Sequence, residues 1–366
     1  MPSAHIIGAG VFGAWVAHAL MRRGWKVRLS DQHGPANSRA SSGGETRIIR
    51  SGYGPLSLYS RWARQSLPEW LELERRAGER LFVRTGALFL GGASVWLQDT
   101  MRTLAAQGVP VRWLARDDFA VRYPQLSFPD TAGAVLEPEA GVLFARRAVQ
   151  RLVALLIQDG VSYEQRAVEP HALIHESRAD AIVFACGPWL PTLFPDVLRN
   201  AIFPTRQEVF FFGAPGGDAR FSAESCPAWV AFDEGVYGLP DLEHRGVKIA
   251  FDAHGEDADP ERMERNVSAA SVARMRDVLR QRIPALADAP LLEARVCQYE
   301  NTSNGHLLID RLPGDDRVWI AGGGSGHGFK HGPAVGAYLV DLIDGSGVAD
   351  PTFALAGRPP RARAVF

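Results

Sequence analysis

The N-terminal segment HIIGAGVFGAWVAHALMRRGWKVRLSD constrains the fold of this chain more than any other stretch. An apolar run typical of a buried strand precedes Gly8, Gly10 and Gly13, and apolar residues at helical spacing follow them. A second, alternating run ends at Asp31, 18 residues after Gly13. This order of strand, glycine turn, helix and strand, with the spacing G-x-G-x-x-G, predicts a dinucleotide-binding βαβ unit.

Each position of the motif has a physical role in such a unit. Gly8 permits the tight turn, Gly10 lets a pyrophosphate approach the backbone, and Gly13 lets the helix pack on the sheet. The start of the helix offers unpaired N–H groups to the phosphates, and Asp31 is placed to bind a ribose diol. The motif alone does not separate NAD from FAD. Its position at the start of the chain favours FAD, and so does the interruption of the dinucleotide-binding domain by a β-rich region, described below.

Composition excludes several other classes. The chain has 366 residues, of which 46% are hydrophobic and 22% charged, and its net charge of −1 predicts no nucleic-acid or membrane partner. No apolar run approaches the roughly 20 residues that span a bilayer, and the start lacks the features of a signal peptide, so we expect a cytoplasmic protein. Widely spread cysteines argue against a disulfide scaffold and a zinc site; they are Cys186, Cys226 and Cys297.

The rest of the sequence alternates between helical and strand-rich stretches. Helices are expected over residues 59–76, where Pro68 should kink or divide the helix, and over 146–159, 262–282 and 333–343. Strand-rich texture covers residues 81–144 and 206–252. The predicted fold is mixed α/β (α+β): a Rossmann-like FAD-binding domain and a discontinuous β-rich substrate domain built on a mainly antiparallel sheet.

We expect both domains to be assembled from separate segments. The FAD-binding domain would comprise residues 1–80, 145–205 and 290–366, and the last of these includes the loop GSGHGFK. The substrate domain would comprise residues 81–144 and 206–289.

Four further motifs carry a resemblance to a known family. They are SSGGETRIIR (41–50), GVKIAFD (246–252), CQYENTSNGHLLID (297–310) and GSGHGFK (324–330). With the N-terminal glycines they closely resemble the monomeric sarcosine oxidase family of the D-amino acid oxidase superfamily, over about residues 5–345. Its members are FAD-dependent oxidases of secondary amino acids, including N-methyltryptophan and pipecolate oxidases. The resemblance implies a monomeric enzyme that oxidises the C–N bond of a small amine or amino acid with O₂, forming H₂O₂.

The resemblance also implies how the cofactor is held. Cys297 lies 33 residues before Lys330, the spacing of the family's flavin-attachment cysteine, which implies a thioether to the 8α carbon of FAD. A buried free thiol is the alternative. The cofactor-binding candidates are Gly8, Gly10, Gly13, Asp31, Ser41, Arg47, Val168, Cys297, Gly324, Gly326, Gly328 and Lys330.

Further roles carry over by position. Arg47 matches an arginine beside the isoalloxazine ring, and Lys248 matches a lysine that helps O₂ accept electrons; these are the catalytic candidates. Arg50 and Lys330 match the pair that binds the substrate carboxylate, a task suited to a guanidinium fork and an ammonium. Tyr237 matches a pocket tyrosine, although a core tyrosine is a serious alternative.

Two departures put sarcosine itself in doubt as the substrate. Asp252 stands where sarcosine oxidases have a pocket histidine, and a carboxylate there would favour a cationic amine and repel a second carboxylate. Gly43 replaces another histidine and is expected to leave more room above the flavin. Both changes suggest a larger or differently charged substrate. In the glycine-rich loop, His327 is expected to pack or hydrogen-bond locally, and His331 to lie on the surface.

Three rival functions remain open. A flavin-dependent dehydrogenase or a natural-product tailoring enzyme could use the same scaffold on a cyclic imino acid or a carrier-bound amine. A non-catalytic flavin- or nucleotide-binding protein is a rival from another class. An NAD-dependent dehydrogenase would fit the glycines, but it explains nothing about Cys297 or Lys330.

Overall fold

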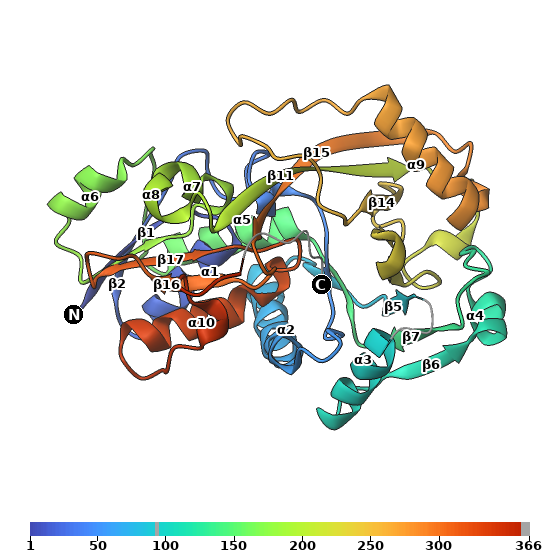
Figure 1. Cartoon of the computed structure of the whole chain (residues 1–366), viewed down its shortest axis with the longest axis horizontal. Coiled ribbons are helices and arrows are strands. Elements are labelled where there is room, and N and C mark those ends of the chain that lie inside the picture. Colours follow the sequence, from blue (N-terminus) through green and yellow to red (C-terminus); the bar gives the residue numbers. More distant parts are fainter. Residues whose placement is uncertain (92–94, 360–366) are drawn as a thin grey trace.

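The computed structural model describes residues 1–91 and 95–359. Within them, the strands form a six-stranded sheet, an eight-stranded sheet and a small three-stranded sheet. Figure 1 shows the six-stranded sheet with its helices in one half of the molecule and most of the eight-stranded sheet in the other. The predicted mixed α/β fold is therefore confirmed, whereas the division into domains at the stated boundaries stays a prediction.

The six-stranded sheet gathers segments from the start, middle and end of the chain. Its order is β16 (Leu308–Arg311), β17 (Val318–Gly322), β10 (Ala181–Phe184), β1 (Ser3–Ile7), β2 (Lys26–Asp31) and β9 (Ser162–Gln165). All neighbours are parallel except β16 and β17. The central strands read as continuous apolar runs because helices cover both of their faces.

Helices α1 (Val11–Arg22) and α10 (Gly332–Ile343) cross closely against this sheet. Gly336 permits the crossing, since a Cβ there would stand 2.5 Å from the carbonyl oxygen of Trp15. Trp15 meets Trp70 edge to face, with ring centroids 5.0 Å apart. Trp70 belongs to α2 (Ser57–Ala77), which contacts α10 and α5 (Ala145–Gln158).

Two helix predictions need correction. Pro68 does not divide helix α2, which continues through it as one 21-residue helix with Gly78 (φ +62°) as its C-cap, because its buried face of Trp62, Trp70 and Leu73 stays in register on both sides of the proline; a kink at Pro68 stays a prediction. The helix predicted for residues 262–282 is α9 (Ala269–Arg282) only. Ser268 starts it by accepting a hydrogen bond from the Ser271 N–H, a capping signal that the polar stretch before it conceals.

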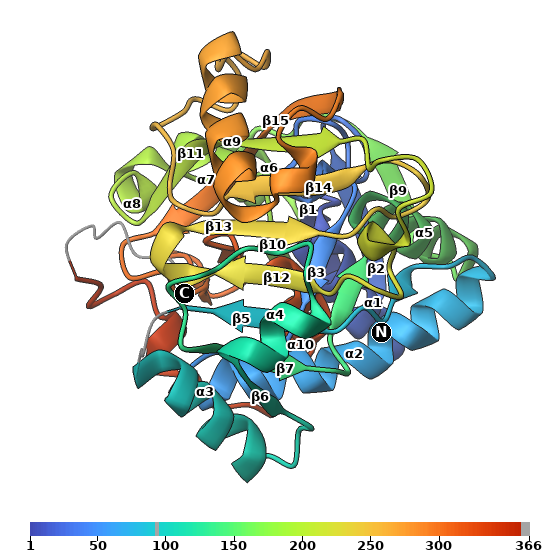
Figure 2. The same cartoon turned by 90° about the vertical axis from the view of Figure 1, so that its right-hand side faces the viewer.

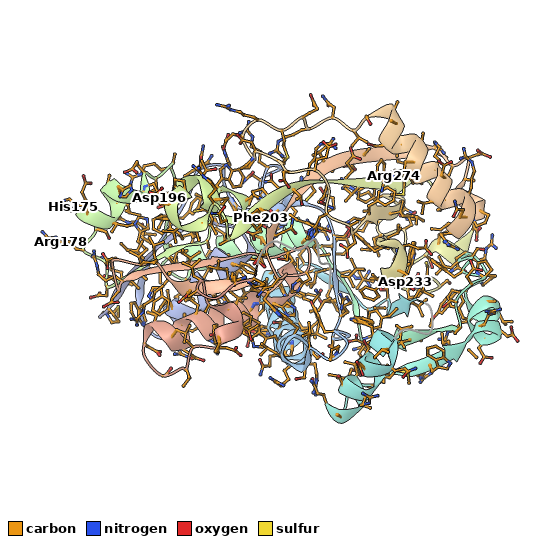
Figure 3. All side chains as sticks on the ribbon, in the orientation of Figure 1. His175, Arg178, Asp196, Phe203, Asp233 and Arg274 are labelled. Atoms are coloured by element: carbon orange, nitrogen blue, oxygen red, sulfur yellow. The ribbon has the colours of Figure 1, made fainter. Side chains whose placement is uncertain are left out.

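The eight-stranded sheet is antiparallel except between β12 and β5. Its order is β15 (Leu291–Thr302), β11 (Ile202–Phe212), β14 (Val247–Phe251), β13 (Val236–Leu239), β12 (Ala228–Ala231), β5 (Ala87–Leu90), β7 (Gly133–Glu137) and β6 (Arg112–Ala115). Figure 2 shows several of these strands side by side, with α9 at the top, α4 (Arg116–Arg122) in front of the lower strands and α3 (Val95–Ala106) at the bottom. Arg274, labelled in Figure 3, lies 4.0 Å from the ring centroid of Phe251 and so helps to fix α9 over β14.

Short elements complete the connections. The small sheet has the order β3 (Arg47–Ile49), β8 (Gly141–Leu143), β4 (Phe82–Val83). Helices α6 (Pro170–Glu176), α7 (Leu190–Leu193) and α8 (Pro195–Leu198) flank the six-stranded sheet in Figure 1. No helix in the described ranges is long and apolar enough to cross a membrane.

Candidate functional site

A cleft opens where β1, β2 and β10 end and α1 begins. Gly8 adopts φ +106°, and a Cβ at this position would stand 2.3 Å from the carbonyl oxygen of Ala185. A Cβ on Gly13 would meet the Gly8 carbonyl oxygen at 1.9 Å, so both glycines are required by packing. Gly10 is the N-cap of α1, and no side chain within the described ranges caps it, which leaves the N–H groups of the first turn for a ligand.

Asp31 stands at the end of β2 and lines the same cleft. Its Oδ2 accepts a hydrogen bond from the Ala9 N–H at 2.7 Å, and its Oδ1 accepts from the N–H groups of His33 and Gly34, each at 2.8 Å. The carboxylate therefore ties the glycine turn to the loop after β2. The carboxylate oxygens have lone pairs left to accept further hydrogen bonds, so binding of a ribose by Asp31 stays a prediction.

Other residues of the cleft meet the requirements of a dinucleotide. Ser41 and Val168, both predicted to bind the cofactor, line it. The Oγ of Ser41 is buried and has no hydrogen-bond partner among the described residues. A buried orphan hydroxyl beside an uncapped helix start is an arrangement that a bound phosphate or sugar would satisfy. The residues present thus fit the expected cofactor.

Arg47 and Cys297 lie together beyond the cleft. Nη2 of Arg47 is 3.6 Å from Sγ of Cys297 and donates to the Ser41 carbonyl oxygen at 2.7 Å, while Nη1 donates to the Thr46 carbonyl oxygen at 2.8 Å. Gly44 makes room for the guanidinium, since a Cβ there would stand 2.5 Å from Nη1. Cys297 is half-buried on β15. The fold thus brings the predicted attachment cysteine and the predicted flavin-side arginine into contact.

A second cavity collects most of the predicted substrate residues. It is lined by Thr46, Arg47, Ile48, Arg50, Val230, Tyr237, Asp252, Tyr299, Ser325, Gly326, His327, Phe329 and Lys330. Lys330 Nζ donates to the Tyr53 hydroxyl and to the His327 carbonyl oxygen, both at 2.7 Å. Burial, and then the charge of Arg50, lowers the pKa of Lys330 well below its usual value. Two neighbouring buried cations would gain strongly from an anion between them.

Arg50 reaches this cavity from the end of β3. Its guanidinium carbon lies 4.5 Å from the ring centroid of Tyr53 and 5.4 Å from that of Phe232, and Nη1 donates to the Gly52 carbonyl oxygen. Glu137 shapes the turn that follows, because its carboxylate oxygens accept from the N–H groups of Ser51 and Gly52. The guanidinium is therefore oriented by aromatic stacking as well as by hydrogen bonds.

Asp252 supplies the negative charge in the same cavity. The Tyr299 hydroxyl donates to its Oδ1 at 2.9 Å. Burial raises the pKa of Asp252, and the Tyr299 hydrogen bond and the charges of Arg50 and Lys330 oppose that shift. Tyr237 completes this wall, with its ring centroid 5.7 Å from Lys248 Nζ. Cations and a carboxylate that line one cavity are suited to a zwitterionic ligand.

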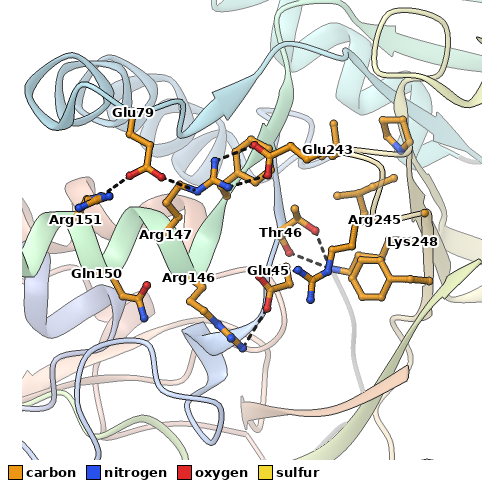
Figure 4. A pocket seen from close by; sticks show the side chains of 16 residues that line it. Glu45, Thr46, Glu79, Arg146, Arg147, Gln150, Arg151, Glu243, Arg245 and Lys248 are labelled. Carbon is orange, nitrogen blue, oxygen red and sulfur yellow. Dashed lines mark hydrogen bonds and ion pairs between the residues drawn. The ribbon is translucent and has the colours of Figure 1, made fainter. Parts of the chain in front are cut away.

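Lys248 stands on the other side of Thr46, at a separate, charged cavity of about 600 Å³ (Figure 4). Its Nζ donates to the Thr46 carbonyl oxygen at 2.9 Å, and the side chain is 2% exposed. Burial, followed by the charge of Arg47, lowers the pKa of Lys248 to about 7. Ion pairs such as Arg146–Glu45 (3.2 Å) and Arg147–Glu243 (2.8 Å) line the cavity wall. Thr46 lines both cavities, so Lys248 and the substrate residues approach one region from two sides.

Two sequence predictions about individual residues were wrong. His331 is fully buried, not on the surface, and its Nε2 lies 2.8 Å from the Tyr53 hydroxyl. Gly43 leaves no extra room, because a Cβ there would stand 1.9 Å from the Asn37 carbonyl oxygen. His327 does bond locally, to the Tyr53 hydroxyl at 3.2 Å and to the Gly305 carbonyl oxygen at 3.0 Å.

The glycines of the loop GSGHGFK allow close packing on neighbouring elements. A Cβ on Gly324 would stand 3.2 Å from Oε1 of Glu300, and one on Gly326, where φ is +78°, would stand 2.8 Å from the Tyr299 ring. A Cβ on Gly328 would meet the Phe12 ring at 2.9 Å. The loop therefore lies against β15 and α1, between the cleft and the second cavity.

Sequence reasoning missed two tyrosines at the centre of this site. Tyr53 contacts Arg50, Lys330 and His331, and Tyr299 holds Asp252. For Tyr299 a signal was present, since it lies two residues from Cys297 on β15 and so shares its face. For Tyr53 the signal was weaker: an aromatic residue between two glycines, three positions after Arg50.

Comparisons with known proteins agree with this architecture. The family model described as FAD dependent oxidoreductase matches residues 4–342. The monomeric sarcosine oxidase of Bacillus sp. (strain NS-129) is 30% identical, over 92% of this chain and 91% of its own. The N-methyl-L-tryptophan oxidase of Salmonella typhi is 28% identical, over 93% and 94%. The crystal structure of L-proline dehydrogenase from P. horikoshii has a similar fold, with a TM-score of 0.80 at 20% identity over 96% of this chain and 95% of that one.

Proposed function

The chain belongs to the FAD dependent oxidoreductase family, and from that premise we propose that it oxidises the C–N bond of an N-methyl or cyclic secondary amino acid. The products would be an imine and H₂O₂. The carrying observation is the cavity in which Arg50, Lys330 and Asp252 converge. Relatives named for sarcosine and N-methyl-L-tryptophan support the same substrate class.

The protein's part in this reaction is to bind and orient. Arg50 and Lys330 hold the substrate carboxylate, and Asp252, with Tyr237 and Tyr299, faces the amine end. FAD, when bound, would supply the two-electron acceptor for the hydrogens that the substrate loses from C–H and N–H, with O₂ as the final acceptor. The substrate loses two hydrogens as it becomes an imine, O₂ gains two as it becomes H₂O₂, and water then hydrolyses the imine. Lys248 would place positive charge where O₂ is reduced.

The substrate is expected to be larger than sarcosine or to carry a further hydrogen-bond donor. Asp252 is held by Tyr299 at one oxygen, which leaves the other to accept from a donor on the ligand. Since Gly43 is closed off by the Asn37 backbone, any added space comes from elsewhere in the cavity.

The test is a panel of N-methyl, cyclic and primary amino acids with the purified holoprotein in air. We expect a secondary amino acid to give one H₂O₂ for each O₂ consumed, and primary amino acids to react more slowly. Reduction of a dye acceptor without H₂O₂ would instead assign a flavin-dependent dehydrogenase or tailoring enzyme.

We further propose that FAD is joined covalently to Cys297. The half-buried thiol beside Arg47 supports this assignment. Wild-type protein denatured in SDS should keep its flavin fluorescence, and Cys297→Ala should lose it completely. Cys186→Ser is the matched control, because Cys186 lines the cleft but burial raises its thiol pKa and keeps it protonated. Release of flavin from the wild type by acid would contradict the assignment.

We also propose that the protein acts as a monomer in the cytoplasm, without a nucleic-acid or membrane partner. The monomeric sarcosine oxidases among the relatives support the first point. Light scattering coupled to gel filtration should give a mass near 39.9 kDa; twice that mass would contradict it.

A further inference from the structure

A buried carboxyl group on β15 takes no part in the substrate cavity. Glu300 is 7% exposed and lines the dinucleotide cleft together with Gly8, Gly10 and Asp31. It lies three residues after Cys297 on the same strand, and its side chain belongs to the opposite face of that strand.

The two oxygens of this carboxyl group differ. Oε1 lies next to Gly324, where a Cβ would stand 3.2 Å from it, and the nearby backbone N–H groups of Gly323 and Gly324 favour the charged form of the group. Oε2 is buried and has no hydrogen-bond partner in the part of the chain that the structure describes. Burial raises the pKa of Glu300 to about 7, against the effect of the two N–H groups. An orphan acceptor of this kind costs stability unless a ligand satisfies it.

Small neighbours keep this oxygen open to the cleft. A Cβ on Gly187 would stand 3.5 Å from Oε2, and one on Gly322 would stand 3.4 Å from it. Gly187 follows β10 and Gly322 ends β17, so Oε2 lies at the carboxyl ends of two parallel strands. That edge of an open α/β sheet is where ligands bind.

The order of groups along the cleft indicates which part of a dinucleotide reaches Glu300. Asp31 marks the ribose end and the start of α1 marks the pyrophosphate. Cys297 marks the flavin ring in the proposed attachment. Glu300 adjoins the glycine loop that runs on to Lys330, which puts it past the pyrophosphate on the flavin side. The part of FAD between pyrophosphate and ring is the ribityl chain, which carries hydroxyl donors.

We propose that Glu300 is a cofactor-binding residue whose unpartnered oxygen accepts a hydrogen bond from a ribityl hydroxyl of FAD. The inference rests on the family's cofactor and not on the proposed substrate, so it stands or falls independently of the amine oxidation. It also gives a reason for a carboxyl group in a cleft built for phosphates, because a hydroxyl satisfies the acceptor where a phosphate would repel it.

The test measures FAD binding in a Cys297→Ala background, where binding is reversible. Glu300→Met should raise the dissociation constant for FAD roughly tenfold to a hundredfold, the range expected for the loss of a hydrogen bond to a charged or buried acceptor. Glu300→Gln should fall closer to the wild type, since its amide still pairs with a hydroxyl. Glu293→Met is the matched control: it makes the same change elsewhere on β15, at a partly buried ion pair with Arg245, and should bind FAD normally.

Deoxy analogues of FAD separate cofactor binding from a purely structural role. An FAD analogue without the relevant ribityl hydroxyl should bind the Cys297→Ala protein more weakly than FAD does, by a similar factor. In the protein that also carries Glu300→Met, the analogue and FAD should bind equally well. If Glu300→Met instead lowers the melting temperature of the apoprotein and weakens every analogue by one common factor, Glu300 serves only to hold the glycine loop. If Glu300→Met no longer weakens the binding of an FAD analogue that lacks a hydroxyl on the adenosine ribose, the ribityl assignment is overturned.

Discussion

Replacing Arg50 with alanine is expected to lower kcat/KM for amines that carry a carboxylate by roughly a hundredfold to a thousandfold, about 3–4 kcal/mol. Arg50 is 6% exposed and lines a cavity that it shares with Lys330. A carboxylate brought into this cavity loses its water, so the loss of one buried cation leaves it poorly compensated. The measurement compares each amino acid with its methyl ester or decarboxylated analogue.

The esters set the scale of the Arg50 effect. For a substrate without a carboxylate, Arg50→Ala should change kcat/KM by less than about threefold, because little charge is left unpaired. Arg50→Lys should recover part of the loss but lack the bidentate geometry. Arg274→Ala removes a stacked arginine outside the cavity and serves as the control. Equal losses for acids and esters would remove Arg50 from carboxylate binding.

Replacing Lys248 with methionine is expected to slow reoxidation of the reduced protein by O₂ roughly a hundredfold to a thousandfold, with little effect on reduction by substrate. Lys248 lies at a cavity separate from that of Arg50 and Lys330 and is 2% exposed. Its ammonium would stabilise negative charge on O₂ as electrons arrive. Stopped-flow measurement of the two half-reactions separates the effects.

The same lysine predicts a pH dependence. Burial lowers the pKa of Lys248 to about 7, so its side chain is charged below that pH and neutral above it. The rate constant for reoxidation should therefore fall as the pH rises through about 7, and negative charge beside Nζ would move this midpoint upward. Lys248→Met should give a flat profile, whereas Lys26→Met, at an exposed lysine, should leave both rate and profile unchanged. Equal slowing of both half-reactions would argue against this role.

Lysine usage itself points to the site. The sequence contains three lysines, Lys26, Lys248 and Lys330, among 40 basic residues. Lys248 and Lys330 are 2% and 4% exposed, whereas arginines form the surface ion pairs. A compact ammonium whose pKa falls on burial suits a dry site, while a guanidinium stays charged. The scarcity of lysine is visible in the amino-acid sequence alone.

The fold was predictable where the signal was local. Gly8, Gly10, Gly13 and Asp31 lie within one continuous segment, and their spacing specifies the βαβ unit whatever the rest of the chain does. The apolar runs of β10 and β17 likewise mark buried parallel strands. The prediction of helix over residues 262–268 was wrong, because the pattern of a polar stretch does not show whether it packs on the rest of the protein. The helix begins after Ser268, whose side chain caps it.

The site was predictable only as far as the motifs reached. Tyr53 and Lys330 are 277 positions apart, and their hydrogen bond exists because α2 packs on α10 near the glycine loop. His331 looked like a surface residue beside glycines, yet the same packing buries it against Tyr53. Gly43 was interpreted as open space, but only the position of the Asn37 backbone shows that the space is filled. Long-range contacts of this kind leave no periodic trace in the sequence.

The most direct test of the central claim is anaerobic mixing of the holoprotein with secondary amino acids, followed by admission of O₂. We predict that at least one N-methyl or cyclic amino acid bleaches the flavin absorbance completely. Admission of O₂ should then restore that absorbance and release one H₂O₂ for each flavin. A flavin that stays oxidised with every N-methyl and cyclic amino acid tested, while dithionite still reduces it, would contradict the account.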